Sequence, residues 1–429
     1  MRLQLRLAAI CLAGCLLAPG PAPAEDISPA DARRHLAALV PFISELRADH
    51  RTEPMAAIAV AWSRAGDVDG AFEFARDIQD HYVRAVTLFR LATHYSDKGE
   101  IKRALTVARE IRNSYYRVRT YGSIAKDQAL AGDKAGARQS LRTAQLALPG
   151  VPKEFDPRGT IAVALVAIGE DQQARQLFDK LEFESRPSSY LGATQPLVEL
   201  SEYLAKAGMT DRALAMARKI VNDYDKPLAF YGIVMHLIDQ GDLATALRVV
   251  REMPRNPTWS ASGIISRGLW AAAYGRIANA QVDAGDREGA LDTIEKAFSV
   301  LRNEKAWITS NAAFEILAPS LAKAGELTAA ELFASLISNI DGQVNVMAAI
   351  ATELAKMDDI PKARSMLRRA MIIPDAYPTV EYTEAEAWTG DIRGAIGTAR
   401  GLPTQKERAD AFKGIADIVG EMAARSLAR

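Results

Sequence analysis

The chain has 429 residues and carries 53 basic and 53 acidic side chains, so its formal charge is zero. This balance gives no electrostatic basis for binding nucleic acid or an anionic membrane surface, and we expect neither partner. The two cysteines, Cys11 and Cys15, both lie near the N-terminus. The rest of the chain therefore offers neither a disulfide framework nor a cysteine nucleophile.

Residues 1–24 have the pattern of a secretory signal peptide. Arg2 and Arg6 form a basic start, and the apolar run from Leu7 to Ala18 is too short to span a bilayer as a mature helix. Ala22-Pro23-Ala24 supplies a cleavage site before Glu25. This interpretation predicts a periplasmic protein, secreted across the inner membrane, with no transmembrane segment in the mature chain.

A second interpretation of the same segment is open. Leu12-Ala13-Gly14-Cys15 resembles the lipobox of bacterial lipoproteins, which would put a lipid anchor on Cys15 and make the protein an outer-membrane lipoprotein. Both interpretations place the protein in a bacterial cell envelope.

Residues 25–51 are expected to form an N-terminal capping helix. Ser28 is a typical helix cap, Pro29 suits the first turn, and Asp31 places an acid three residues after the cap. This helix precedes the first full repeat.

Residues 52–403 repeat one pattern of two helices joined at a glycine corner. Around Gly132, apolar residues recur at helical spacing on both sides, as Ile124 and Ala137 illustrate. The glycine can end the first helix in left-handed geometry, and the carboxylate of Asp133 can cap the second. Ten corners follow this pattern, at Gly66, Gly99, Gly132, Gly169, Gly208, Gly241, Gly285, Gly325, Asp358 and Gly390.

An alanine stands five residues after every one of these corners, from Ala71 to Ala395. A small side chain at a fixed position allows two helix axes to approach closely. Each hairpin would bury part of its apolar surface internally and the remainder against the next hairpin, as in an α-solenoid.

The corners at 66, 99 and 132 stand 33 residues apart, and the two-helix unit with its second-helix alanine resembles the tetratricopeptide (TPR-like) repeat, which has about 34 residues. The family's early tryptophan and closing proline are mostly missing here. The resemblance implies an all-α, right-handed α-solenoid of about ten helix-turn-helix repeats. It also implies a protein-interaction scaffold.

Four intervals between corners are longer than the rest. Their extra residues are rich in helix breakers and can either carry contacts or only lengthen a helix or adjust the superhelix. They lie at Pro149–Pro157, Arg186–Pro196, Pro254–Gly263 and Arg302–Trp307. Residues 404–429 then have the apolar spacing expected of a C-terminal capping helix.

The segment RNSYYRVRTY, residues 112–121, combines the residue types that are enriched at binding hot spots. We expect it, with the repeat-equivalent Arg84, to bind a protein or peptide partner. The alternative is a packing role in which arginine covers the end of the preceding helix. The candidate residues are Tyr115, Tyr116, Arg117, Arg119, Tyr121 and Arg84.

No catalytic, cofactor-binding or metal-binding site is expected. The five histidines, His35, His50, His81, His94 and His236, form no ligand motif. The rival expectation is a cell-wall glycan-acting enzyme that uses Glu384, beside Glu381 and Glu386 and near Trp388, as its acid. Trp259, Trp270 and Trp307 could frame an aromatic pocket, although large aromatics at such junctions more often belong to the core.

Overall fold

The computed structural model describes residues 27–152, 156–184, 195–221, 223, 225–254, 261–303, 311–337 and 339–428. Within these residues every regular element is a helix, and the predicted all-α solenoid of helical hairpins is confirmed. The expected signal peptide, including Cys15, lies outside the described residues, as do most of the breaker-rich connections.

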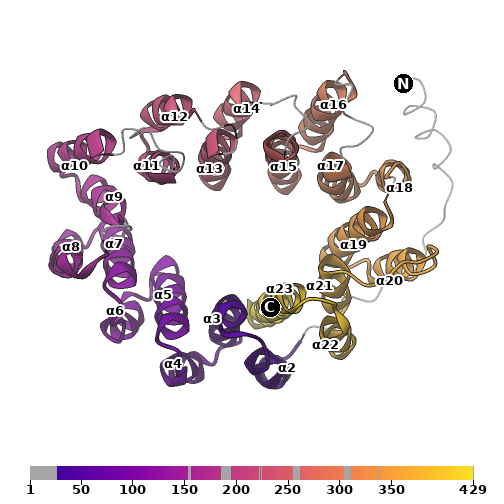
Figure 1. Ribbon diagram of the computed structural model, residues 1–429, viewed down its shortest axis with the longest axis horizontal. Helices are drawn as coiled ribbons and strands as arrows, with labels where there is room; N and C mark the ends of the chain where they lie inside the picture. The colour runs from indigo at the N-terminus through magenta and orange to yellow at the C-terminus, as the bar shows by residue number, and fades with distance from the viewer. Residues whose placement is uncertain are drawn as a thin grey trace.

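The helices form two concentric layers that close into a ring (Figure 1). Each hairpin contributes its first helix to the inner layer and its second helix to the outer layer. The inner helices are α3 (Ala48–Arg64), α5 (His81–Asp97), α7 (Ser114–Leu130), α9 (Arg158–Ile168), α11 (Gln195–Lys206), α13 (Asp225–Asp239), α15 (Ala261–Asp283), α17 (Asn311–Lys323), α19 (Ile340–Lys356), α21 (Val380–Trp388) and α23 (Gln405–Ala428).

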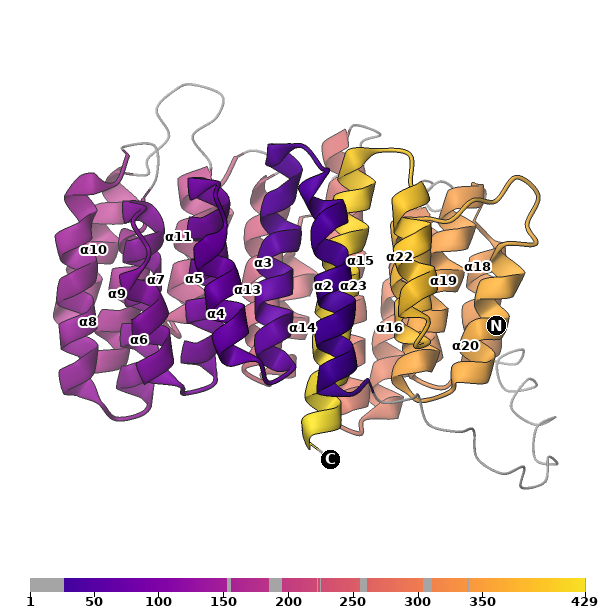
Figure 2. The same ribbon diagram turned by 90° about the horizontal axis from the view of Figure 1, so that it is seen from below.

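The outer helices lie against the side of the inner layer that faces away from the centre of the ring (Figure 1). They are α2 (Pro29–Ser44), α4 (Val68–Asp77), α6 (Ile101–Arg109), α8 (Lys134–Ala147, followed by the short 3-10 turn Leu148–Gly150), α10 (Asp171–Glu184), α12 (Thr210–Lys219), α14 (Leu243–Glu252), α16 (Arg287–Asn303), α18 (Leu327–Ser335), α20 (Ile360–Ala370) and α22 (Ile392–Gly401). The helices run along the ring axis (Figure 2), so their ends form two rims: the N-terminal rim, where the inner helices begin, and the corner rim, where the hairpins turn.

The hairpin corners have the backbone conformation that the sequence predicts. All ten anchor residues have positive φ angles, including Asp358 at 62°, the one anchor that is not glycine. Asp133 caps α8 by accepting a 2.8 Å hydrogen bond from the N–H of Gly136. Glu100, in contrast, makes no side-chain cap bond to α6. The aspartate corners therefore provide a cap, whereas this longer glutamate provides only its charge.

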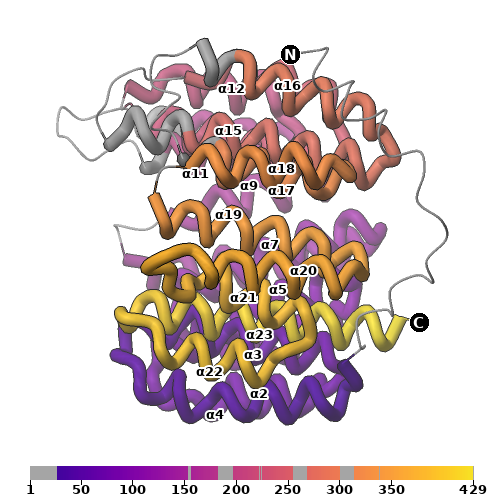
Figure 3. Tube along the Cα trace, turned by 90° about the vertical axis from the view of Figure 1, so that its right-hand side faces the viewer, coloured from indigo at the N-terminus to yellow at the C-terminus, as the bar shows by residue number. Residues whose placement is uncertain are grey.

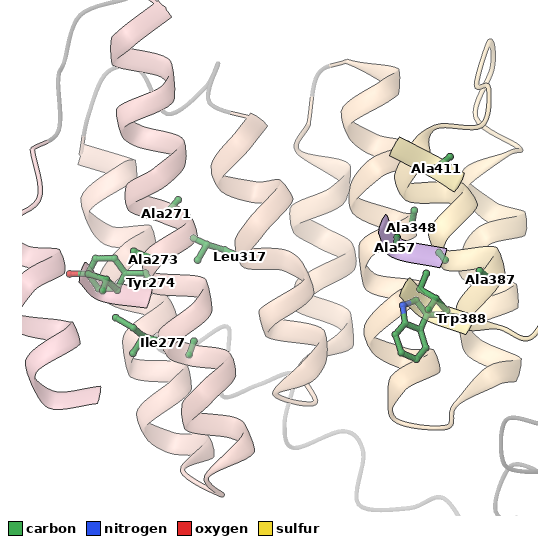
Figure 4. Packing of buried hydrophobic residues seen from close by; sticks show 14 of the residues in the cluster. Ala57, Ala271, Ala273, Tyr274, Ile277, Leu317, Ala348, Ala387, Trp388 and Ala411 are labelled. Carbon is green, nitrogen blue, oxygen red and sulfur yellow. The ribbon is translucent and has the colours of Figure 1, made fainter. Parts of the chain in front are cut away.

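Alanine at the fifth position after each anchor is fully buried in all ten hairpins. Gln128 and Ser140 add a buried polar contact between α7 and α8, in which the Ser140 hydroxyl donates to Gln128 Oε1 at 2.6 Å. Small side chains recur where the inner helices pack, as Ala271 on α15 and Ala348 on α19 illustrate (Figure 4). Close approach of the backbones is thus repeated around the ring, as the alanine pattern indicates.

The ring closes because α23 packs alongside α3, in the same direction. At the N-terminal rim the N–H of Arg47, just before α3, donates to Gln405 Oε1 at 2.8 Å. At the corner rim a side-chain carbon of Leu427 lies 3.5 Å from the position that a Cβ on Gly66 would occupy. Helices α2 and α3, which open the described part of the chain, therefore lie side by side with its last helix, α23 (Figures 1 and 3).

Helix α2 fills the outer position behind α23, so these two helices make a hairpin that has no covalent corner. The rings of Phe42 on α2 and Phe412 on α23 stack at 6.2 Å. Arg33 on α2 lies 3.8 Å from Asp67, the corner acid of the next hairpin. The same relationship recurs between ordinary hairpins, where Arg138 on α8 pairs with the corner acid Glu170 at 2.8 Å.

The sequence analysis assigned residues 25–51 and 404–429 to capping roles at two separate ends. In the structure the helices from these segments cover each other and α3. One continuous cluster of buried hydrophobic residues crosses the junction and includes Leu36, Ala57 and Ala411. The physical reason is that a solenoid whose successive hairpins turn through a full circle brings its two exposed ends together.

Candidate functional site

The candidate residues from 112–121 lie at the start of α7, on the N-terminal rim. Asn113 caps this helix by accepting from the N–H of Tyr116 at 3.2 Å, and Asp80 caps α5 by accepting from the N–H of Tyr82 at 2.8 Å. The two caps start neighbouring inner helices in the same way. Tyr82 and Tyr115 are each the second residue of their helix, so the repeat places them at equivalent positions.

The structure brings Tyr115 and Tyr116 together with Tyr82. The hydroxyls of Tyr116 and Tyr82 are hydrogen bonded at 3.2 Å, and their rings meet edge to face with centroids 6.0 Å apart. Tyr82 is 57% exposed, whereas Tyr116 is half-buried. Tyr82 is not among the residues that the sequence pattern selects, although its position 33 residues before Tyr115 was the available signal.

Arg119 lies between two aromatic rings from neighbouring inner helices. Its guanidinium carbon is 4.8 Å from the centroid of Phe89 on α5 and 5.4 Å from that of Tyr115. It also donates to the Tyr115 hydroxyl at 3.3 Å. A guanidinium held over aromatic faces is pre-organised, so less conformational freedom is lost when it binds. We call Tyr82, Phe89, Tyr115, Tyr116 and Arg119 the tyrosine-arginine cluster.

Burial in this region favours the protonated forms of Tyr116 and Tyr203. Burial, reinforced by the hydrogen bond to Tyr82, raises the pKa of Tyr116 above its usual value. Burial also raises the pKa of Tyr203 on α11 to about 12, and raises the pKa of Glu199 against the opposing effect of Arg119. The cluster combines tyrosine hydroxyls with one guanidinium group, which suits recognition by hydrogen bonding and stacking.

The other three candidate residues have packing roles or are partly covered. Arg84 donates to the carbonyl of Ile78 at 3.0 Å, which is the end of α4. Tyr121 is buried at 6% exposure. Arg117 is half-buried, and its Nε is buried without a hydrogen-bond partner. Arg84 thus makes the helix-end contact that was considered as the alternative to binding.

Glu384 lies at the interface between α21 and α23. One of its carboxylate oxygens is 2.1 Å from the position that a Cβ on Gly414 would occupy, so only glycine fits there without movement. Burial, followed by the nearby charge of Glu381, raises the pKa of Glu384 to about 7. Neighbouring Trp388 lies between two cations, with Lys356 Nζ at 5.4 Å and the guanidinium of Arg425 at 5.0 Å from its ring.

Among the remaining candidates, those within the described residues have packing roles or stand apart from one another. Trp270 is buried at 2% exposure and packs on Tyr274 with centroids 4.5 Å apart, while Trp259 and Trp307 lie outside the described residues. Burial lowers the pKa of His94 to about 4. Across the described ranges, no group of three or more histidine, cysteine or acidic side chains could hold a metal ion. None of the helices described there is long and apolar enough to cross a membrane.

No protein-family model and no curated protein matches this chain. Among solved structures it is similar to Ton1535 from Thermococcus onnurineus NA1, with 17% identity and a TM-score of 0.31, over 84% of this chain and 99% of that one. It is also similar to a chain in the structure of Naa15/Naa10 bound to HypK-THB, with 14% identity and a TM-score of 0.23. That match covers 86% of this chain and 60% of the other. Neither likeness is close enough to carry an inference about function.

Proposed function

We propose that this protein is a scaffold that binds a protein or peptide partner, and that the tyrosine-arginine cluster is its main contact surface. The observation that carries the proposal is Tyr82, an aromatic side chain that stays 57% exposed while its hydroxyl is held by Tyr116. Tyrosine and arginine supply large contact areas and directed hydrogen bonds at little entropic cost, which is why they dominate binding hot spots.

An extended segment is the partner form that suits this surface. Arg119 bridges α5 and α7, and Tyr203 on α11 packs against Gly159 on α9, where a Cβ would lie 2.0 Å from its ring. Aromatic side chains from α5, α7 and α11 are therefore placed across four adjacent inner helices, with the Tyr203 ring lying over Gly159 of α9. A peptide lying across these helices would meet rings and hydroxyls in succession, with Arg119 available for a backbone carbonyl or a carboxylate.

A photo-crosslinking experiment tests this contact surface. p-Benzoylphenylalanine at position 82 is expected to form an adduct with a specific partner in envelope extract, and Arg119→Ala is expected to remove it. The matched control is the same probe at Tyr377, another exposed tyrosine, 47% exposed, which is bonded to Asp341 at 2.8 Å. Identical adducts at both positions, or adducts unaffected by Arg119→Ala, would contradict the assignment.

We further propose that the scaffold acts in the periplasm, in assembly or export of the cell envelope. The support comes from Arg2 and Arg6, the apolar run from Leu7 to Ala18 and the small residues at 22–24. Mass spectrometry of the mature N-terminus tests both this location and its alternative. An unmodified start at Glu25 is expected, whereas a lipid on Cys15 would identify a lipid-anchored subunit of an outer-membrane complex.

A second candidate function is hydrolysis of cell-wall glycan with Glu384 as the acid. The observation that favours it is the pKa of about 7, which suits a general acid near neutral pH. The packing of this carboxylate against Gly414 favours a structural role instead. Incubation with purified peptidoglycan decides between them: release of soluble fragments that Glu384→Gln abolishes would establish the enzyme and overturn the scaffold proposal.

A further inference from the structure

Helix α2 differs from every other outer helix described here in how it is held. The outer helices of the ten covalent hairpins follow their inner partners through a tight corner of a few residues. Among the described helices, α2 is joined to α3 alone, through Glu45–Arg47, and is held against α23 by side-chain contacts. The pair formed by α2 and α23 can therefore separate without unfolding a corner, unlike the ten hairpins whose two helices are joined by one.

The contacts that hold α2 are well defined. Ala32, Leu36, Leu39 and Ile43 form one fully buried stripe along the helix. Phe42 stacks on Phe412, and the guanidinium carbon of Arg400 on α22 lies 4.4 Å from the centroid of Phe42. Arg33 and the indole of Trp62 complete the set, since the indole N–H donates to the Arg33 carbonyl at 3.5 Å.

Helix α2 also contains a weak point near the connection on which it would turn. Pro41 lies inside its last turn and lacks an N–H, so the ladder of helical hydrogen bonds is interrupted there. Local opening is easiest for elements that few covalent connections and few packing contacts restrain. A hinge close to Glu45 would let α2 leave while α3 keeps its place in the inner layer.

We infer that α2 is a reversible latch: when it detaches from α22 and α23, the seam between α3 and α23 loses its outer cover and the ring opens there. The opening itself is independent of any partner. Only its use, as the entrance for a partner that binds the inner layer, rests on the proposed function.

Thiol accessibility measures the detachment in the full chain. With Cys11 and Cys15 replaced by serine, a single cysteine is introduced either on the latch, as Leu39→Cys, or on an ordinary outer helix, as Val249→Cys on α14. Both original side chains are fully buried, at 0% exposure. Under native conditions the latch thiol is expected to react with a thiol reagent roughly ten-fold faster than the control thiol, because only α2 can open locally.

A second variant separates local detachment from global unfolding. Phe42→Ala removes the contacts with Phe412 and Arg400, and should accelerate labelling at position 39 roughly ten-fold while labelling at position 249 stays constant. The latch would be overturned if Phe42→Ala accelerated labelling equally at positions 39 and 249. It would also be overturned if the two single-cysteine proteins that retain Phe42 were labelled at equal rates. Ile43→Cys on the same stripe serves as the latch probe if Leu39→Cys does not fold.

Spin labels across the seam provide a direct readout of ring opening. Labels at Arg47→Cys and Gln405→Cys should show a distance distribution that broadens toward longer distances in Phe42→Ala. Labels at Arg138→Cys and Glu170→Cys span two ordinary hairpins, and their distance distribution should be unchanged by Phe42→Ala. A narrow seam distribution in Phe42→Ala would show that α2 does not control closure, whatever the outcome of the crosslinking experiment on Tyr82.

Discussion

Gly420 of α23 lies directly against Ala61 of α3, although the two residues belong to the last and the first inner helices of the chain. A Cβ on Gly420 would be 2.7 Å from the Cα of Ala61, which is closer than atoms can approach without a shift. The seam of the ring is therefore a backbone-to-backbone contact that depends on the absence of a side chain.

Gly420→Ala should destabilise the folded ring. The added methyl group has to push α3 and α23 apart, and overpacking of this kind costs about 1–3 kcal/mol. Gly397→Ala on α22 is the matched control, since nothing lies within 4 Å of its Cβ position and alanine favours a helix by about 0.5–1 kcal/mol over glycine. Chemical denaturation should thus give changes of opposite sign. Stabilisation by both substitutions would contradict the close seam.

Asp358→Gly should stabilise the protein. Asp358 is the one anchor that adopts a positive φ, 62°, with a side chain, and glycine removes the clash of its Cβ in that conformation. We expect a gain of roughly 0.5–1 kcal/mol after the greater freedom of glycine in the unfolded chain is counted. Asp358→Ala keeps the Cβ and should bring no gain. Equal stabilisation by both variants, measured by thermal unfolding, would point to the charge of Asp358 rather than to its backbone.

Glu384→Gln should remove part of the dependence of stability on pH. The pKa of Glu384 is about 7 in the folded protein against an ordinary value of 4.5, so the folded state holds this proton more tightly. The resulting stabilisation is complete below pH 4.5 and is lost as the pH rises to about 7. The shift corresponds to about 3 kcal/mol.

The difference between Glu384→Gln and the parent protein should therefore grow in favour of the variant between pH 4.5 and 7, and stay constant above. Denaturant titrations at a series of pH values measure it. Glu381→Gln offers a control. Removing that neighbouring charge should lower the pKa of Glu384 and so narrow the pH range over which the stability difference grows. A difference that is flat across this range would show that Glu384 is not held as an acid in the interface.

Gln128→Ala should cost about 1–3 kcal/mol, because it leaves the buried hydroxyl of Ser140 without its acceptor. Replacing both residues by alanine should cost less than the sum of the two single changes, since neither polar group is then left unpaired. A double-mutant cycle measured by denaturation provides the coupling energy. Strict additivity would mean that the contact contributes nothing. Gln281 and Thr293 form the same bond at 2.7 Å in another hairpin and should behave alike.

Residues within each hairpin are sufficient to specify the helices and corners of this protein. Corner residues such as Gly132 and the alanines that follow act within one hairpin, where their conformational preferences and small size decide the outcome regardless of the rest of the chain. Tyr115, Tyr116 and Arg119 could be grouped as one candidate patch from the sequence because they belong to one helix. Tyr82 was not included, because its exposure and its bond to Tyr116 depend on how two hairpins pack.

Closure of the stack, and the packing of α2 behind α23, depend on contacts between helices that are far apart in the chain. Closure results from the small rotation between each pair of hairpins, summed around the whole array, and no short segment encodes that sum. The contact between Gly420 and Ala61 exists only after the first and last inner helices have met, and the burial that raises the pKa of Glu384 requires α21 and α23 to pack together. Local preferences made the hairpins, and the accumulated packing angles made the ring.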